Sequence, residues 1–188
     1  MPAPHIAIYG SSTVTEGDRA YRDALALGAE LARSGAVIMT GGYAGVMEAA
    51  SRGAHEAGGH VIGVTLELFD IDPSRIPNRW IAERFHAPDL FERLRRMVQR
   101  ADGFVAVTGS IGTITEVCLT WNLLMLGARS RAPLVLLGEE WPAWLEATRR
   151  AGAMSEALME HVALAGSPGE AARLALGGAG VAARSTRP

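Results

Sequence analysis

Two glycine-rich turns each lie between a predicted strand and a predicted helix, at residues 41–45 (GGYAG) and 109–113 (GSIGT). Glycine lets the backbone approach a ligand closely, and a helix N-terminus offers unpaired amides and a positive dipole end. Together the two turns predict a phosphate-binding site. Either turn alone is equally compatible with a purely structural strand-to-helix connection.

One carboxylate and one guanidinium lie close to the second turn in the sequence. Glu116 follows Thr113 by three residues, one helical turn on, and Arg93 lies in the helix that precedes the adjoining strand. This pair suits cleavage of an N-glycosidic bond: a carboxylate stabilises an oxocarbenium-like transition state or activates water, and arginine binds an anion bidentately. Spacing alone favours a plainer interpretation, in which Glu116 stabilises a first helical turn and Arg93 forms a surface ion pair.

Composition excludes several other chemistries. The chain has no lysine, so all 18 basic residues are arginines, and mechanisms that need an ε-amino group are excluded. Cys118 is the only cysteine, so neither an intramolecular disulfide nor a multi-cysteine metal site can form. The five histidines show no metal-binding spacing, and we expect no metal.

The sequence also argues against binding of a dinucleotide, a nucleic-acid polymer or a membrane. The turn at residues 10–13 (GSST) is not G-x-G-x-x-G, and Thr40 and Gly41 follow the second predicted strand where an acidic residue would bind ribose. The formal net charge is −2, which does not suit a protein that coats an anionic polymer or surface. No run reaches the roughly 18 apolar residues of a membrane helix. Residues 1–5 lack the pattern of a secretory signal, so we expect a soluble cytoplasmic protein.

Short runs rich in Val and Ile alternate with helical patterns along 188 residues, which predicts an α/β fold with a Rossmann-like, doubly wound parallel sheet. We expect a single domain over residues 1–176, a flexible tail over 177–188 and a long loop over 65–79, a length that is usually functional or mobile. Strands are predicted at 6–9, 36–39, 60–64, 80–86, 103–107, 133–137 and 161–165, and helices at 20–34, 46–57, 89–100, 114–126, 141–151 and 168–176.

Four motifs, in order and at the right spacing, resemble the Lonely Guy (LOG) family of phosphoribohydrolases between about residues 6 and 137. They are a G-S-S turn at 10–12, a G-G-x-x-G-x-M turn at 41–47, an R-x-x-x-M helix at 93–97 and, at 108–116, a segment similar to P-G-G-x-G-T-x-x-E. The resemblance implies a Rossmann-like fold. It also implies hydrolysis of a nucleoside 5′-monophosphate, a cytokinin precursor or AMP, to free base and ribose 5-phosphate.

The resemblance also implies roles for particular residues. Arg93 and Glu116 are expected to be the catalytic pair. No cofactor is implied, and family members are typically homodimers. The residues expected to bind the 5′-phosphate are Gly109, Ser110, Gly112 and Thr113, with help from Gly42 and Gly45.

The chain departs from the family pattern at four positions. Thr108 replaces a proline and Ser110 a glycine, while Leu94 and Thr115 stand where lysine and glutamate are common. A Cβ at Ser110 is expected either to crowd the phosphate or to change the loop conformation.

A second function therefore stays open. The fold also resembles molybdenum-cofactor carriers and nucleotide-sensing proteins, so the alternative is a non-catalytic binder or carrier. Retention of Arg93 and Glu116 favours the enzyme, whereas Thr108 and Ser110 favour the binder. The sequence identifies neither the base nor whether the 65–79 loop closes over the substrate.

Overall fold

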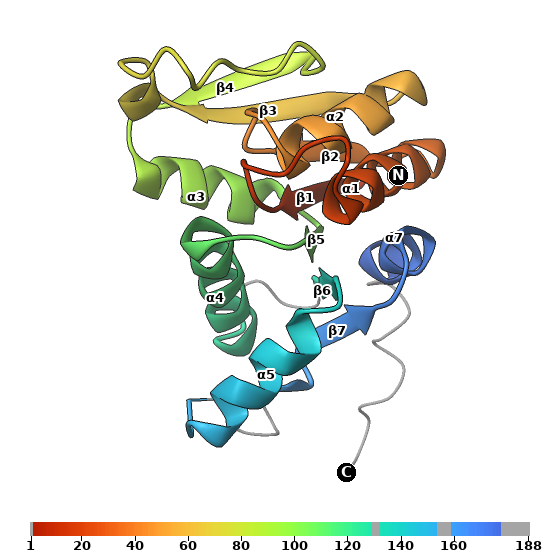
Figure 1. Cartoon of the computed structure of the whole chain (residues 1–188), viewed down its shortest axis with the longest axis vertical. Helices are drawn as coiled ribbons and strands as arrows, with labels where there is room; N and C mark the ends of the chain where they lie inside the picture. The colour runs from red at the N-terminus through yellow and green to blue at the C-terminus, as the bar shows by residue number, and fades with distance from the viewer. Residues whose placement is uncertain (1, 129–131, 154–158, 178–188) are drawn as a thin grey trace.

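The computed structural model describes residues 2–128, 132–153 and 159–177, and this part of the chain contains a seven-stranded sheet (Figure 1). The strand order is β4-β3-β2-β1-β5-β6-β7, and every neighbouring pair is parallel. The strands are β1 (His5–Tyr9), β2 (Val37–Thr40), β3 (Val61–Leu66), β4 (Glu83–Ala87), β5 (Gly103–Ala106), β6 (Leu134–Leu137) and β7 (Val162–Ala165).

Helices cover both faces of the sheet, because side chains of each strand alternate between two apolar cores. In β1, Ile6 and Ile8 pack under α1, α2 and α7, whereas Ala7 and Tyr9 pack under α3, α4 and α5 (Figure 1). The helices are α1 (Arg19–Arg33), α2 (Val46–Glu56), α3 (Leu90–Arg100), α4 (Ile111–Met125), α5 (Trp141–Arg150) and α7 (Pro168–Leu176), with a short 3-10 helix η1 (Glu67–Phe69).

The fold class predicted from the sequence is confirmed, with differences on one side of the sheet. The strand expected at 80–86 is β4, which begins at Glu83 because Trp80 lies in a turn where its backbone N–H donates to Asn78 Oδ1 (3.1 Å). The loop expected at 65–79 is shorter, since β3 continues to Leu66 and η1 follows it. All but Gly177 of the predicted tail lies outside the described residues.

The order of the strands creates a crevice beside β1. The chain adds β2, β3 and β4 on one side of β1, then crosses to add β5, β6 and β7 on the other. Connections leave β1 and β5 in opposite directions at their carboxyl ends, and ligands of open α/β sheets bind at such a switch point.

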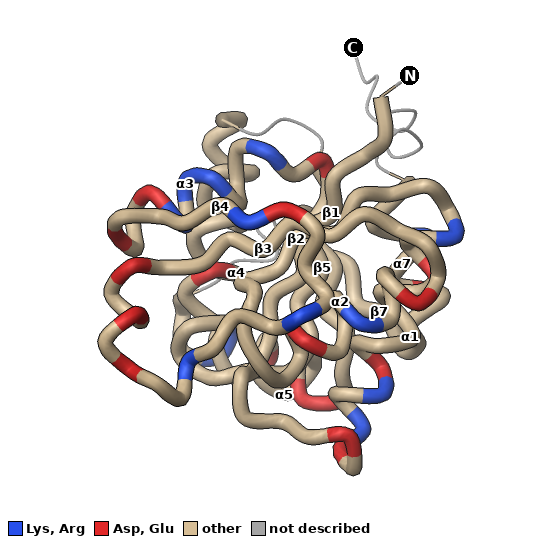
Figure 2. Tube along the Cα trace, turned by 90° about the horizontal axis from the view of Figure 1, so that it is seen from above, with Lys and Arg blue, Asp and Glu red and all other residues tan. Residues whose placement is uncertain are grey.

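Charges of both signs are interspersed along the described chain trace (Figure 2). Among the described helices, none has both the length and the apolar character needed to cross a membrane.

Candidate functional site

A cleft of about 410 Å³ opens at this switch point, a volume in the usual range for a small-molecule site. Three parts of the chain form its walls: the turns after β1 and β2 with the start of α2, the segment after β3, and the beginning of α4 with one side chain from α3. The lining residues are Gly10, Ser12, Tyr43, Ala44, Met47, Phe69, Asp72, Ser74, Arg75, Ile76, Arg93, Ser110, Gly112, Thr113 and Glu116.

The N-terminus of α4 points its first turn at the cleft. Ser110 is the N-cap, and its carbonyl accepts from the N–H of Ile114 (3.0 Å), while its side chain makes no capping bond. The amides of residues 111–113 therefore have no partner within the helix, which makes this end suited to an anion. The φ of Ser110 is −97°, so the loop conformation does not require glycine here.

The remaining glycines of the predicted phosphate site shape turns behind the cleft. A Cβ on Gly109 would lie 2.0 Å from Thr113 Oγ1, so glycine makes room for this buried threonine. Gly42 and Gly45 have φ values of 80° and 71°, and the N–H of Gly42 donates to Thr40 Oγ1 (3.1 Å). Within the described chain, Gly42, Gly45 and Gly109 lie outside the cleft lining. Their part in phosphate binding stays a prediction.

Arg93 and Glu116 meet inside the cleft, although they lie on different helices. Arg93 is only 8% exposed; its Nε donates to the carbonyl of Val64 (2.9 Å), and its guanidinium lies 3.5 Å from Glu116 Oε1. The Glu116 side chain is 12% exposed. A surface ion pair for Arg93, the plainer interpretation of the sequence, is therefore wrong, because α3 packs this residue against the sheet.

Burial sets the protonation behaviour of this pair. Loss of hydration raises the pKa of Glu116 from 4.5 to about 7, although the Arg93 charge pulls in the opposite direction. Beside it, burial raises the pKa of Tyr9 far above its ordinary value, so this phenol stays neutral and bonds to Thr120 Oγ1 (3.0 Å). A carboxylate that titrates near neutrality can exchange a proton with a substrate or water.

The sequence indicated no separate role for Gly41, although this residue lies against Arg93. A Cβ on Gly41 would lie 2.1 Å from an Arg93 terminal nitrogen and 2.5 Å from Met47 Sδ, so glycine at this position leaves the space that the guanidinium occupies. The G-G-x-x-G-x-M pattern contains Gly41, but residue spacing does not show that this glycine lies against a side chain from α3.

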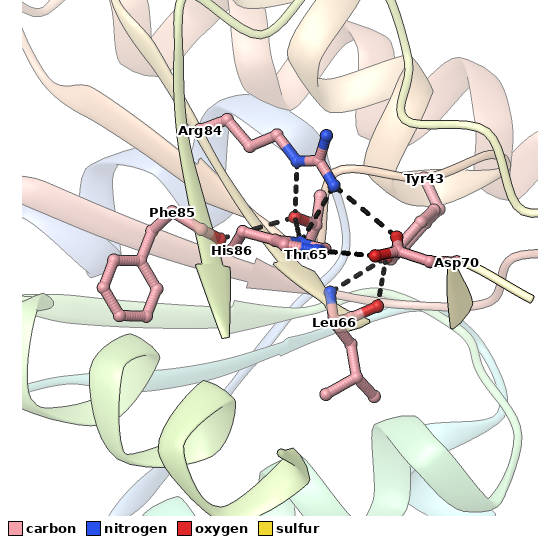
Figure 3. Close-up of polar contacts among 7 residues, drawn as sticks. All are labelled: Tyr43, Thr65, Leu66, Asp70, Arg84, Phe85 and His86. Atoms are coloured by element: carbon pink, nitrogen blue, oxygen red, sulfur yellow. Dashed lines mark hydrogen bonds and ion pairs between the residues drawn. The ribbon is translucent and has the colours of Figure 1, made fainter. Parts of the chain in front are cut away.

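Residues 67–79 form one wall of the cleft, and hydrogen bonds hold both ends of this segment. The sequence predicted this region only as part of a long loop at 65–79, of a length that is usually functional or mobile. At the first end, His86 Nε2 lies 2.8 Å from Asp70 Oδ2 (Figure 3). Arg84 can only donate, so its contact with His86 Nδ1 (2.9 Å) makes Nδ1 an acceptor and places the imidazole proton on Nε2, toward Asp70. Thr65 Oγ1 accepts from Arg84 Nε (2.8 Å) and completes the network.

The second end is fastened by Asn78. Its N–H donates to the carbonyl of Gly42 (2.8 Å), and its side-chain amide donates to the carbonyl of Tyr43 (3.0 Å). Tyr43 in turn bridges to β3, where its hydroxyl accepts from the N–H of Leu66 (2.9 Å; Figure 3). The glycine-rich turn at 41–45 thus supports the segment that faces it.

No group of three or more possible metal ligands occurs among the residues that the structure describes. Cys118 is half-buried on α4, and burial raises the pKa of its thiol, which keeps it protonated.

The topology and the cleft define a Rossmann-like α/β protein with its candidate site at the switch point of the sheet. More narrowly, the chain belongs to the SLOG cluster4 family, whose model matches residues 3–150. This match confirms the predicted membership of the LOG family.

Relatives and structural neighbours point to two kinds of protein. A probable cytokinin riboside 5′-monophosphate phosphoribohydrolase of Oryza sativa, LOGL9, is 34% identical over 59% of this chain and 50% of its own length. The Arabidopsis thaliana cytokinin riboside 5′-monophosphate phosphoribohydrolase LOG7 is 33% identical over 61% of this chain and 52% of its own length. The chain thus spans about half the length of these plant relatives. The molybdenum cofactor carrier protein of Chlamydomonas reinhardtii has a similar structure, with a TM-score of 0.68 and 27% identity over 91% of this chain and 94% of that one.

Proposed function

We propose that this protein hydrolyses the N-glycosidic bond of a nucleoside 5′-monophosphate, with AMP or a cytokinin riboside monophosphate as substrate, and releases free base and ribose 5-phosphate. The observation that carries the proposal is the buried contact of Arg93 with Glu116, directly beside the open N-terminus of α4. The sequence relatives named as phosphoribohydrolases support the same reaction.

The proposed mechanism assigns each part of the cleft one task. The first amides of α4 bind the 5′-phosphate and fix the position of the ribose. As the C1′–N bond breaks, its electron pair passes to the base, and positive charge develops at C1′. The Glu116 carboxylate stabilises this charge and takes a proton from the water whose oxygen bonds to C1′. The departing base takes up the proton that Glu116 removed from the water, so Glu116 is ionised again and the reaction balances with water alone.

Arg93 holds Glu116 in the orientation that this mechanism needs. Its Nε is anchored on the carbonyl of Val64, so the guanidinium faces the carboxylate from a fixed position. An opposite charge nearby favours the ionised form of Glu116, and without Arg93 its pKa would rise further.

The alternative function is a non-catalytic carrier or sensor, and the likeness to the Chlamydomonas reinhardtii carrier favours it. Such a protein needs an anion site but no carboxylate that titrates near neutrality. The buried Glu116 therefore favours the hydrolase.

We also propose a homodimer, as the family resemblance implies. Several large apolar side chains near the ends of α3 and α4 are exposed in a single chain, which supports an interface there: Leu90, Phe91, Ile111, Met125 and Leu126. Light scattering should give twice the mass of one chain; a monomer at working concentration would contradict the proposal.

The test of the reaction is incubation with AMP, GMP, CMP, UMP and isopentenyladenosine monophosphate, followed by chromatography for free base and ribose 5-phosphate. Glu116→Gln should lower the rate by about a hundredfold or more, the usual contribution of a positioned acid–base group. Glu30→Gln is the matched control, because Glu30 is an exposed carboxylate on α1. An unchanged rate in Glu116→Gln would refute the mechanism, and nucleotide binding without base release in the wild type would favour the carrier.

A further inference from the structure

The wall formed by residues 67–79 lies where the base of a bound nucleotide would be. With the phosphate at the start of α4 and C1′ beside Glu116, the base is directed toward the part of the cleft that these groups do not occupy. That part is formed by Tyr43 and Met47 together with five side chains of the segment: Phe69, Asp72, Ser74, Arg75 and Ile76.

Planar side chains pack against one another along this wall. The Arg75 guanidinium lies 4.0 Å from the ring centroid of Phe69, and Phe69 packs edge-on against Tyr43 at 5.4 Å. Arg75 is 46% exposed on its side chain, so it is not shut off from the cleft that it lines. Guanidinium and aromatic planes are the groups on which nucleobases stack in proteins.

A hydrogen-bond acceptor lies beside these planes. Asp72 accepts from the N–H of Ser74 (3.0 Å), from Ser74 Oγ (2.6 Å) and from Arg75 Nε (3.1 Å). The bonds from Ser74, followed by the Arg75 charge, lower the pKa of Asp72, so it is an acceptor-only group at neutral pH. A carboxylate has about four lone-pair sites, so capacity for one more donor is left on a side chain that is 42% exposed.

Both ends of the segment are fastened, which keeps these groups in place before a ligand arrives. The Asp70–His86 contact holds the start (Figure 3). The two bonds from Asn78 hold the end. Preorganised groups bind a ligand with a smaller loss of conformational entropy than mobile ones.

We propose that residues 67–79 recognise the base, in that Phe69 and Arg75 provide a stacking surface and Asp72 accepts a hydrogen bond from an exocyclic amine. The preferred ligands are therefore amino-bearing nucleotides such as AMP and CMP, over their oxo counterparts IMP and UMP. This inference rests on the proposed function, since it needs a nucleoside monophosphate in the cleft.

The test measures binding by calorimetry in a Glu116→Gln background, where substrates stay intact, and initial rates of base release in the otherwise wild-type chain. The ligands are AMP, IMP, CMP, UMP and ribose 5-phosphate. Each amino nucleotide has an oxo partner of nearly the same shape, which differs in the exocyclic group and in the protonation of the adjacent ring nitrogen. The ratio within a pair therefore reports hydrogen bonding at this edge of the base rather than stacking.

Two variants probe the two features of the wall. Asp72→Asn should reduce the preference for AMP over IMP, and for CMP over UMP, by about tenfold, the usual effect of a hydrogen bond to a charged group. Arg75→Ala should weaken all four nucleotides by about tenfold and leave ribose 5-phosphate unchanged, because base stacking is lost and phosphate contacts are not.

Matched controls come from the same segment, outside the cleft lining. Glu67→Gln repeats the carboxylate-to-amide change, and Arg79→Ala removes an exposed guanidinium that lies over Trp80. Neither should alter the binding of any ligand.

The outcomes separate this inference from the proposed function. If the wild type releases no base, the hydrolase proposal fails, and the binding ratios still decide the role of the wall. Two results would overturn the inference. One is that Arg75→Ala weakens the binding of nucleotides and of ribose 5-phosphate equally; the other is that Asp72→Asn leaves the ratio of AMP to IMP affinity unchanged.

Discussion

Arg93 and Glu116 illustrate how position changes the chemistry of ordinary residues. On a surface helix the carboxyl of Glu116 would be ionised at neutral pH, and its contact with Arg93 would contribute little to stability. In the cleft, loss of hydration outweighs the attraction of the guanidinium, and the pKa of Glu116 rises to about 7. The same carboxyl can then act as an acid or a base near neutrality.

The raised pKa of Glu116 predicts that this residue destabilises the fold as pH rises. The folded state holds the proton more tightly than the unfolded chain, so the free energy of unfolding falls between pH 4.5 and about 7 and levels off above it. Relative to Glu116→Gln, the wild type should lose on the order of 3 kcal/mol between pH 4 and pH 8. Urea denaturation of both proteins at these pH values measures the difference; a gap that does not change with pH would contradict the burial argument.

A second prediction at this scale concerns Gly41. In Gly41→Ala the new methyl group would lie 2.1 Å from an Arg93 terminal nitrogen, so the guanidinium must shift from its position beside Glu116. We expect base release to fall by about tenfold or more, since small misplacements in a site cost rates of this order. Circular dichroism should show an intact fold. Gly17→Ala is the control, because its Cβ meets open space; equal activity of both variants would show that Arg93 tolerates the shift.

At the scale of the elements, α3 and α4 position the pair because both cover the same face of the sheet. Leu94 and Met97 bury one side of α3 against β1 and β3, and Arg93 is carried inward with them. Val117 and Trp121 do the same for α4 and bring Glu116 to the carboxyl end of β1. The distance between the two charges is therefore set by two packed helices rather than by a loop.

Removing the N-caps of α3 and α7 should distinguish an effect on stability from an effect on activity. Asp89 Oδ1 accepts from the N–H of Glu92 (2.8 Å) at the start of α3, and Ser167 Oγ accepts from the N–H of Glu170 (3.3 Å) at the start of α7. Replacing either cap by alanine should lower the free energy of unfolding by about 1 kcal/mol in denaturant titrations. Only Asp89→Ala should also reduce base release, because α3 begins one turn before Arg93. Loss of base release in a folded Ser167→Ala variant would contradict the prediction that only the α3 cap affects activity.

At the scale of the whole molecule, one continuous sheet joins both sides of the cleft. β1 pairs with β2 on one side and β5 on the other, so the wall from residues 67–79 and the start of α4 are attached to the same rigid layer. A cleft between two parts of one sheet keeps its shape without a hinge. Burial of both faces by helices makes the sheet the common core of the described chain.

This architecture predicts a single unfolding transition, as expected for one domain. Trp80 lies beside α2 on one side of the cleft, and Trp121 and Trp141 lie on the other. Tryptophan fluorescence and far-ultraviolet circular dichroism should therefore change at the same denaturant concentration. Two separated transitions would show that the halves of the sheet fold independently.

The sequence alone determined the order and type of the elements, because hydrophobic period and glycine punctuation are local signals. Alternating strand and helix patterns led to the parallel sheet, and the four motifs led to the LOG family. The N-cap Asp89 is a local feature of the same kind, because its bond to residue 92 depends only on neighbours in the chain. The start of β4 was misplaced because Asn78 holds Trp80 in a turn through contacts with the distant Gly42 and Tyr43.

Only the tertiary structure decided which of the candidate residues share a cleft. Arg93 and Glu116 were named from the sequence, but their burial, their 3.5 Å separation and the raised pKa of Glu116 depend on how α3 and α4 pack. The space that Gly41 leaves for Arg93, and the edge-on contact of Phe69 with Tyr43, join segments that no spacing rule connects. Such segments come into contact because of the strand order and the crossovers between strands. Their contact then removes water from side chains such as Glu116. Both are properties of the packed chain, which a pattern of neighbouring residues does not contain.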